Sequence, residues 1–224
     1  MAVIRSDQQY IDGVFLRGVP DTAHSGVGSM RASAKHAGEA WKVIHDRHER
    51  VHGDETKTPA ARLKAVADFA KQRLDQVEKY HEQNLEYAHG DLRIAETRLA
   101  QLSAPPGDHI SALRHQEIRA HMRGLDSTQR NALLAQVSET GDRETLHALI
   151  SAPVYLTGLS PHLIAHYRDQ LEVMALPNEY GTRHNVRIAI EAGNAAIHQL
   201  HAHIAAVAPR SEVARIEAAL ADAA

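Results

Sequence analysis

The sequence predicts an all-α protein: a long antiparallel helical hairpin that resembles a coiled coil, a cluster of short helices and a long C-terminal helix. Aromatic residues make up only 4% of the 224 residues, which is few for strands, where aromatic and β-branched side chains are favoured. Good helix formers such as Ala, Leu, Arg, Glu and Gln dominate instead. Apolar residues also recur at steps of three and four over several long stretches, which is the spacing of one helix face.

The first 25 residues form a separate segment because they carry no helical period. Gly13, Gly18 and Pro20 interrupt them, so we expect an extended or irregular N-terminal arm over residues 1–25. The apolar side chains of this arm, Phe15 among them, are too many for a free tail. We expect them to pack on the body of the protein or on a neighbouring subunit.

The helical hairpin is predicted over residues 26–104. Its first helix carries a seam of apolar residues that begins at Val27, includes Trp41 and advances by alternating steps of three and four. This heptad pattern predicts a helix from about residue 29 to residue 52. Gly53 is a natural end for it.

The second helix of the hairpin is predicted to be about 45 residues long, or ~67 Å. Thr58 can cap its start, and Pro59 can take the first helical position, where a missing N–H costs nothing. Pro105 and Pro106 end it. The shorter first helix can cover this long helix only as far as about Glu82.

The far half of the long helix therefore keeps an apolar line that its shorter partner does not reach. A bare line of leucines is disfavoured in water, so either a later helix of the same chain, beginning near Thr182, or another chain should cover it. We assign six residues to these helix or subunit interfaces: Trp41, Leu85, Leu92, Leu99, Leu102 and Phe15.

Residues 107–224 are predicted to form a C-terminal helical domain. Capping signals mark the starts of its short helices at five places: Asp108, Asp126 or Ser127, Asp142, Ser160 followed by Pro161, and Ser211. The first of these helices should turn three apolar side chains inward: Ile110, Leu113 and Ile118. The last long helix is expected to begin at Thr182, to repeat apolar residues with a heptad period and to end at Pro209.

Composition excludes several classes of function. With no cysteine, the chain has no disulfide scaffold, thiolate metal site or cysteine nucleophile. No stretch is apolar enough to span a membrane, and Arg5 and Asp7 interrupt any apolar run that could serve as a secretion signal. The net charge is −3 and basic residues alternate with acidic ones, so the sequence does not favour nucleic-acid binding.

The 17 histidines raise the question of metal binding or of a pH-dependent role. His45, His48, Glu49 and His52 lie at i, i+3, i+4 and i+7, on one face of the first hairpin helix. Imidazole and carboxylate groups suit zinc or iron. A straight helix separates residues i and i+7 by about 10 Å, so we expect one ion to engage only two of the four, with the remaining ligands coming from elsewhere.

Two Glu-x-x-His pairs, Glu78 with His81 and Glu144 with His147, match part of the di-iron pattern of four-helix bundles. Two such pairs are close to what chance gives in a chain this rich in histidine. The sequence has no His-Glu-x-x-His motif, phosphate-binding loop or nucleophile elbow. We therefore assign no catalytic, cofactor-binding or metal residue from the sequence, and we expect no cofactor.

Five short stretches carry a resemblance to known proteins: His121–Leu125, Asn131–Leu134, Gly141–Asp142, Leu149–Pro153 and Leu156–Ser160. Together they look like a segment of the largely uncharacterised helical proteins encoded among the morphogenesis genes of tailed bacteriophages and prophages. The resemblance lies within residues 121–160 and consists of packing and capping signals. It implies a role in a virion or in its assembly, and it carries over no catalytic residue.

These observations favour a non-enzymatic structural or assembly protein of a multi-subunit particle, as a tailed-phage virion component, acting through contacts between helix seams. The expected partners are further copies of the chain and other virion proteins, without a membrane. The expected location is the virion after synthesis in the host cytoplasm, or otherwise the cytoplasm. Two alternatives stay open: a metal-binding helical bundle holding di-iron or zinc, and a cytoplasmic coiled-coil adaptor or chaperone.

Overall fold

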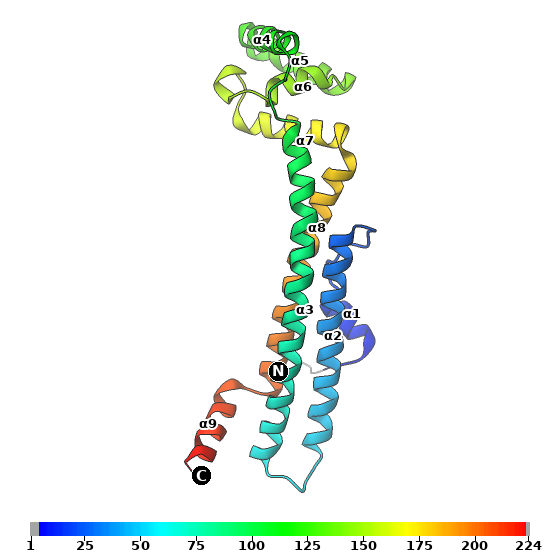
Figure 1. Ribbon diagram of the computed structural model, residues 1–224, viewed down its shortest axis with the longest axis vertical. Helices are drawn as coiled ribbons and strands as arrows, with labels where there is room; N and C mark the ends of the chain where they lie inside the picture. The colour runs from blue at the N-terminus through cyan, green and yellow to red at the C-terminus, as the bar shows by residue number, and fades with distance from the viewer. Residues whose placement is uncertain (1–4, 223–224) are drawn as a thin grey trace. The chain divides into compact units, whose positions relative to one another are not determined.

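A computed structural model describes residues 5–222, and within that range the protein is all-α, as predicted, with no strand. Nine α-helices and one short 3-10 helix follow one another along this part of the chain (Figure 1). Their bounds are α1 Gln8–Phe15, α2 Ser25–His52, α3 Pro59–Gln101, α4 His109–Gly124, α5 Ser127–Thr140, α6 Arg143–Ile150, η1 Val154–Leu156, α7 Pro161–Ala175, α8 Pro177–Val207 and α9 Arg210–Ala221.

The chain divides into two compact units. Of the described residues, unit 1 contains 5–92 and 185–222, and unit 2 contains 93–184. This division differs from the three consecutive segments expected from the sequence. The reason is that α3 and α8 each contribute one part to unit 1 and another part to unit 2.

The expectation of an irregular N-terminal arm is wrong for residues 8–15, which form α1. The Asp7 side chain caps this helix by accepting a hydrogen bond from the Tyr10 backbone N–H at 3.0 Å. Ile11 and Phe15, four residues apart, are buried in the core of unit 1. They pack over Gly38 of α2, where an added Cβ would lie 2.5 Å from Ile11 Cγ2. Tertiary packing thus stabilises a helix too short to show a period; residues 1–4 of the predicted arm lie outside the described range.

Helix α2 begins four residues earlier than expected because α3 caps it. The Asp91 carboxylate accepts hydrogen bonds from the Ser25 hydroxyl and, at 2.7 Å, from the Gly26 backbone N–H. The helix ends at His52, and the Gly53 N–H donates to the Glu49 carbonyl at 3.2 Å, so the predicted end is confirmed.

Helix α3 begins at Pro59, as the capping signal predicts. The Thr58 hydroxyl accepts a hydrogen bond from the Ala61 N–H at 3.2 Å, and the helix continues to Gln101, just before the two prolines. In unit 1, α2 lies along the first part of α3, and α1 and α8 pack with them around one core (Figure 1). The largest side chains at its centre are Phe15, Trp41, Ile44 and Leu200.

Helix α8 covers the apolar line of α3 in unit 1. Val186 and Ala189 are fully buried against Ala88, and Leu85 and Leu92 pack on the same cluster. Of the two possibilities that the sequence offered, a later helix of the same chain or another chain, the structure therefore shows the first. The helix begins at Pro177 rather than at the expected Thr182. Proline is well suited to the first position of a helix, where its missing N–H leaves no hydrogen bond unmade.

Unit 2 is built from short helices whose caps follow the sequence signals. Asp108, Asp126, Asp142 and Ser160 each accept a hydrogen bond from a backbone N–H in the first turn, and Asp126 forms a full capping box with Gln129. The apolar residues at its centre come from α4 to α7: Met122, Leu134, Val137, Leu146, Leu149, Ile150, Leu159, Ile164, Tyr167 and Leu171.

The predicted inner face of α4 is wrong. Ile110 and Leu113 are 66% and 47% exposed, and Ile118 is half-buried, whereas His115 and Met122 face the interior. The helix is amphipathic only weakly, so its orientation is set by the neighbouring helices and by side chains that bind backbone, not by its own apolar residues.

Arg130 shows how loops are held in this unit. Its guanidinium donates to three backbone carbonyls, those of Met122, Leu125 and Gly158, at 3.1, 2.9 and 2.8 Å. Because each of these carbonyls lies at or near an element end, one side chain satisfies acceptors that the helices leave open.

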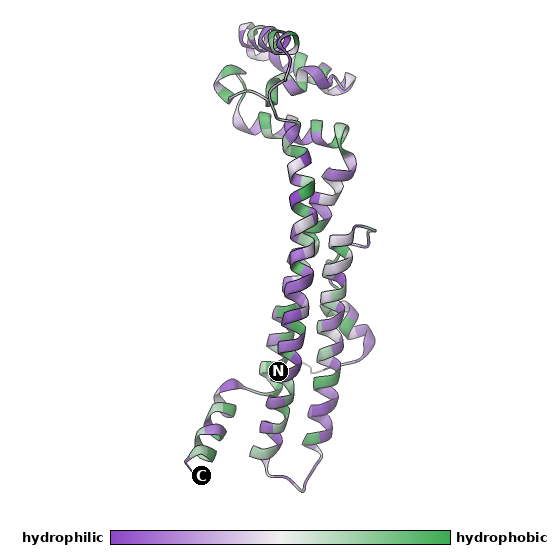
Figure 2. Cartoon of the chain, viewed as in Figure 1, coloured by the Kyte–Doolittle hydropathy of each residue, from purple (hydrophilic) through white to green (hydrophobic). Residues whose placement is uncertain are grey.

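Helix α9 begins at Arg210 and its N-cap is Pro209, so the predicted Ser211 cap is wrong by two residues. None of its described residues is buried. Along the helices of the described range, apolar and polar residues alternate (Figure 2), and none of these helices is long and apolar enough to cross a membrane.

Candidate functional site

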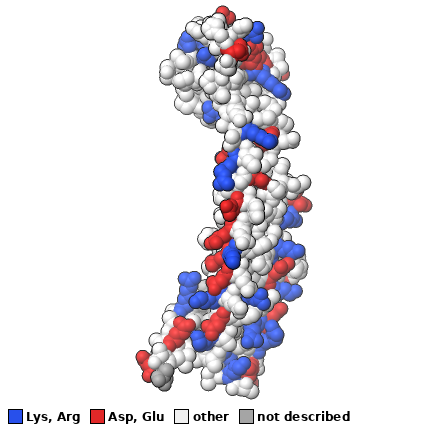
Figure 3. Space-filling view, in the orientation of Figure 1, with Lys and Arg blue, Asp and Glu red and all other residues white. Residues whose placement is uncertain are grey.

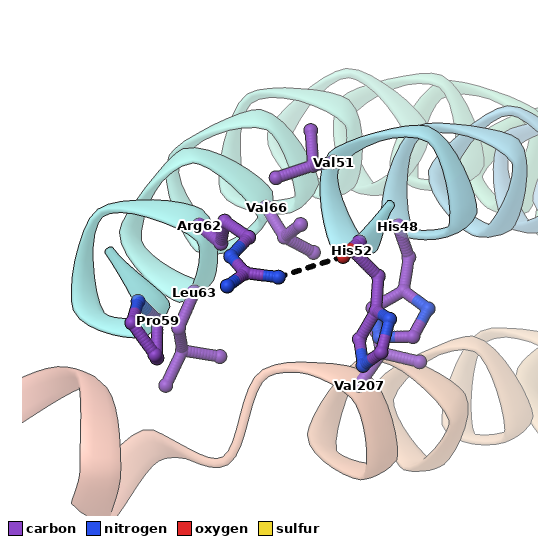
Figure 4. A pocket seen from close by; sticks show the side chains of 8 residues that line it. All are labelled: His48, Val51, His52, Pro59, Arg62, Leu63, Val66 and Val207. Carbon is purple, nitrogen blue, oxygen red and sulfur yellow. Dashed lines mark hydrogen bonds between the residues drawn. The ribbon is translucent and has the colours of Figure 1, made fainter. Parts of the chain in front are cut away.

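A pocket of about 330 Å³ lies in unit 1 where α2 ends, α3 begins and α8 ends. Figure 4 shows the side chains that line it: His48, Val51, His52, Pro59, Arg62, Leu63, Val66 and Val207. The imidazoles of His48 and His52 lie beside each other near Val207, with ring centroids 5.8 Å apart. The walls are mostly apolar, and two imidazoles and one guanidinium provide the polar groups.

The turn that closes this pocket is fixed by hydrogen bonds. Arg62 donates from Nη1 to the His52 carbonyl at 2.8 Å, which satisfies an acceptor at the end of α2 (Figure 4). In the turn itself, hydrogen bonds from Thr56 and then from Lys57 lower the pKa of Asp54 to about 2. The position of His52 therefore depends on local contacts of the turn as well as on α2.

The histidine cluster, defined as His45, His48 and Glu49, adjoins this pocket and shares His48 with it. Its ligand atoms, one from each residue, all lie within 4.8 Å of one another. Glu49 Oε1 is 3.2 Å from His48 Nδ1 and 3.8 Å from His45 Nδ1. The expectation that only two residues of this helix face can approach one ion is wrong, because the side chains converge across the turn more closely than the backbone spacing indicates.

Two aromatic contacts hold the inner side of the cluster. The His45 ring lies 5.5 Å from the Trp41 ring, and His203 of α8 packs edge-on to Trp41 at 4.6 Å. The Trp41 indole N–H donates to the Arg5 carbonyl at 2.7 Å. The only tryptophan of the chain thus contacts both a residue of the cluster and a residue of α8.

Burial favours the neutral form of the His203 imidazole because it lowers the pKa. Its Nδ1–H donates to the Gln199 carbonyl at 2.8 Å, which leaves Nε2 to accept from the Tyr10 hydroxyl, also at 2.8 Å. Burial among Tyr10, Phe15 and Trp41 lowers the pKa of His203, and the Gln199 hydrogen bond opposes that shift only in part.

The two Glu-x-x-His pairs do not form a metal centre. His81 Nε2 hydrogen bonds to Asn194 at 2.9 Å, while Glu78 accepts from His201 at 2.9 Å. In unit 2, Glu144 pairs with Arg114, and His147 donates to the Ala104 carbonyl at 2.9 Å. Among residues 5–222, the histidine cluster is the only group of three or more possible ligands that come together.

Unit 2 has its own buried histidine. His115 is 3% exposed and packs edge-on to His147 at 4.9 Å. Burial, and then the nearby His147, lower the pKa of His115. The contact between the two rings packs α4 on α6.

All six predicted interface residues pack within the chain itself. Trp41 and Phe15 are buried in the main core of unit 1, and Leu85 and Leu92 pack beside α8. In unit 2, Leu99 is buried and Leu102 packs on the apolar centre.

The apolar row, defined as Tyr80 and Tyr87 on the part of α3 that lies in unit 1, is exposed instead. These side chains are 38% and 70% exposed, and they lie seven residues apart along one side of the helix. The row was not predicted from the sequence, because the leucine line is more regular; the seven-residue spacing of the two tyrosines was the available signal.

Comparison with protein-family models, curated proteins and solved structures finds no match to this chain.

The burial of His203 predicts a pH-dependent stability. The unfolded state binds a proton with an ordinary histidine pKa near 6.5, while the folded state resists protonation, so the free energy of unfolding should fall as the pH drops from 7.5 to 5.5. His203→Gln should flatten this part of the dependence. Urea unfolding followed by circular dichroism at several pH values measures it.

The matched control for this measurement is His198→Gln, which changes an exposed histidine of the same helix. It should keep the pH dependence of the unaltered protein. If both variants flatten the curve equally, or neither does, His203 is not the group responsible.

Proposed function

We propose that this protein is a non-enzymatic structural or assembly component of a multi-subunit particle, and specifically of a tailed-phage virion. The observation that carries the proposal is the apolar row on α3, which presents two tyrosines to solvent on one side of the helix. Exposed aromatic side chains grouped on one helix face can form a surface that binds another protein.

The residues of α3 that can form a subunit contact lie on a different side of the helix from the leucine line. The leucine line that motivated the prediction is packed by α8 and by the helices of unit 2, so it needs no other chain. The apolar row is more exposed: among the described residues, only Tyr80 of the row has an aromatic neighbour, the edge-on ring of His36 at 4.9 Å. Subunit contact through this row is therefore the mechanism that we propose.

The occupant that fits the row best is the same row of a second copy. A seven-residue spacing matches the period at which two helices meet along their length. Two identical rows related by a two-fold axis complement each other, since every side chain meets its counterpart or a neighbour. A coiled-coil-like hairpin of α2 and α3 would present this row on the surface of unit 1.

Charge on the accessible face agrees with a protein partner rather than with nucleic acid. Lysine and arginine side chains alternate with aspartate and glutamate over α2 and α3, and the face in Figure 3 has no continuous basic surface. Examples of this alternation are the pairs Lys35–Glu39 and Lys64–Asp68. Pairs of this kind keep a helix solvated and contribute little to stability.

The proposed location follows from the resemblance within residues 121–160 to phage morphogenesis proteins. The segment forms the end of α4, helices α5 and α6, and the turn that leads to the Ser160 cap. The residues of this segment cap and pack helices. Such roles agree with a structural protein and do not point to catalysis. The protein would be made in the host cytoplasm and retained in the particle.

Tyr87→Glu should weaken self-association, because it places a charge at the most exposed side chain of the proposed contact. Loss of a central aromatic residue typically costs about 2 kcal/mol or more, which is about 30-fold or more in Kd. Size-exclusion chromatography with light scattering over a range of concentrations measures the mass. The unaltered protein should be a dimer or larger, and the variant should dissociate at a higher concentration.

His89→Glu is the control, since it adds the same charge at another exposed position of α3 in unit 1, about 160° around the helix from Tyr87. It should associate like the unaltered protein. A monomer at every concentration, or association of Tyr87→Glu that equals that of the control, would contradict the proposed contact.

The virion location is tested separately by quantitative mass spectrometry of purified phage particles whose genome encodes this chain. We expect the protein in a fixed ratio to the other structural proteins. Its presence in the lysate but not in the particles would exclude a virion component and would favour an assembly factor that leaves before completion.

A further inference from the structure

The histidine cluster on α2 has the composition of a site for a transition-metal ion. Two imidazoles and one carboxylate are ligands that zinc and its neighbours accept, whereas calcium and magnesium prefer oxygen alone. All three residues come from one helix, at i, i+3 and i+4, so they share a face of α2. The same helix face leads into the pocket through His48.

The distances fit one ion. Bonds of about 2.0–2.2 Å from zinc to nitrogen or oxygen place the ligand atoms of one ion roughly 3–4 Å from one another. Glu49 Oε1 lies 3.2 Å from His48 Nδ1 and 3.8 Å from His45 Nδ1, within this span. All ligand atoms are within 4.8 Å of one another, so a small rotation of one imidazole completes the arrangement.

A second observation is independent of these distances. The His45 side chain is only 12% exposed, and its Nδ1 atom is buried without a hydrogen-bond partner among the described residues. A buried polar atom without a partner costs free energy, and native proteins rarely leave one. This nitrogen faces Glu49, and an ion held between them would satisfy it.

The surroundings hold the imidazoles on one side and leave the other side open. His45 packs on Trp41 at 5.5 Å, and His48 is fixed in the pocket wall beside His52. Glu49, in contrast, has a side chain that is 64% exposed. Such a site has two placed nitrogen ligands, one adaptable carboxylate and room for water as a further ligand.

We propose that His45, His48 and Glu49 bind one divalent transition-metal ion of the zinc type on α2. The ion would link successive turns near the end of α2, next to the turn that closes the pocket. Its chemical class follows from the ligands, and the site needs no contact between subunits. It is therefore independent of the function proposed above.

Zinc chloride added to the full-length, chelator-treated protein at pH 7.5 tests the proposal by isothermal titration calorimetry. We expect one zinc ion per chain. His48→Ala and Glu49→Gln should each weaken its binding by roughly 10-fold or more, since even changes to groups that only support metal ligands cost about 10- to 100-fold. Binding should also weaken as the pH falls, because protons compete with the metal ion for the imidazole nitrogens.

Trp41 gives a second readout that reports position. Copper(II) bound at the site would lie close to the only tryptophan of the chain and should quench its fluorescence at one equivalent. His48→Ala and Glu49→Gln should abolish this quenching at low copper concentrations. Both residues are partly or mostly solvent-exposed, and circular dichroism can verify that the variants keep their helices.

The control is the double variant His162→Ala/His166→Ala, which removes an exposed histidine pair with i, i+4 spacing on α7. It should keep both the zinc binding and the copper quenching of the unaltered protein. The proposal is overturned if the protein binds no zinc, or if His48→Ala and Glu49→Gln bind zinc and quench as the control does.

Discussion

The structure of unit 1 depends on how closely α8 approaches α2 and α3. Small residues make this approach possible: a Cβ added at Gly26 would lie 3.2 Å from both the Ala88 Cα and a Val186 methyl group. A Cβ at Gly193 would meet the Met30 side chain directly. Because these backbones nearly touch, α8 can bury the line on α3 that α2 does not reach, and no other chain is needed there.

This packing also determines which side chains remain for function. It turns the leucine line inward and leaves the tyrosines of the apolar row on the outside. At the other end of the unit, Val207 of α8 borders the pocket that contains His48, while His203 supports Trp41 beside His45. The contact surface and the histidine cluster are thus two consequences of one three-helix arrangement.

Local signals in the sequence predicted the ends of several helices, whereas features that depend on packing between helices were not predicted. The caps at Thr58 and Asp126 depend on residues a few positions away, and the structure has both. Helix α1 was missed because its stability comes from packing on α2. The exposure of Ile110 was missed because the neighbouring helices orient α4. The convergence of the histidine cluster likewise depends on side-chain directions, which residue spacing alone does not give.

The central claim is that α8 packs along α3 of the same chain. The chain has no cysteine, so Glu78→Cys/His201→Cys places the only two thiols on facing positions, where the native side chains hydrogen bond at 2.9 Å. Both side chains are accessible, at 41% and 34% exposure, so a short bis-maleimide can react with them. We expect a cross-linked product with the mass of one chain, at a yield independent of protein concentration. Covalent dimers formed in its place, or no cross-link, would contradict the claim.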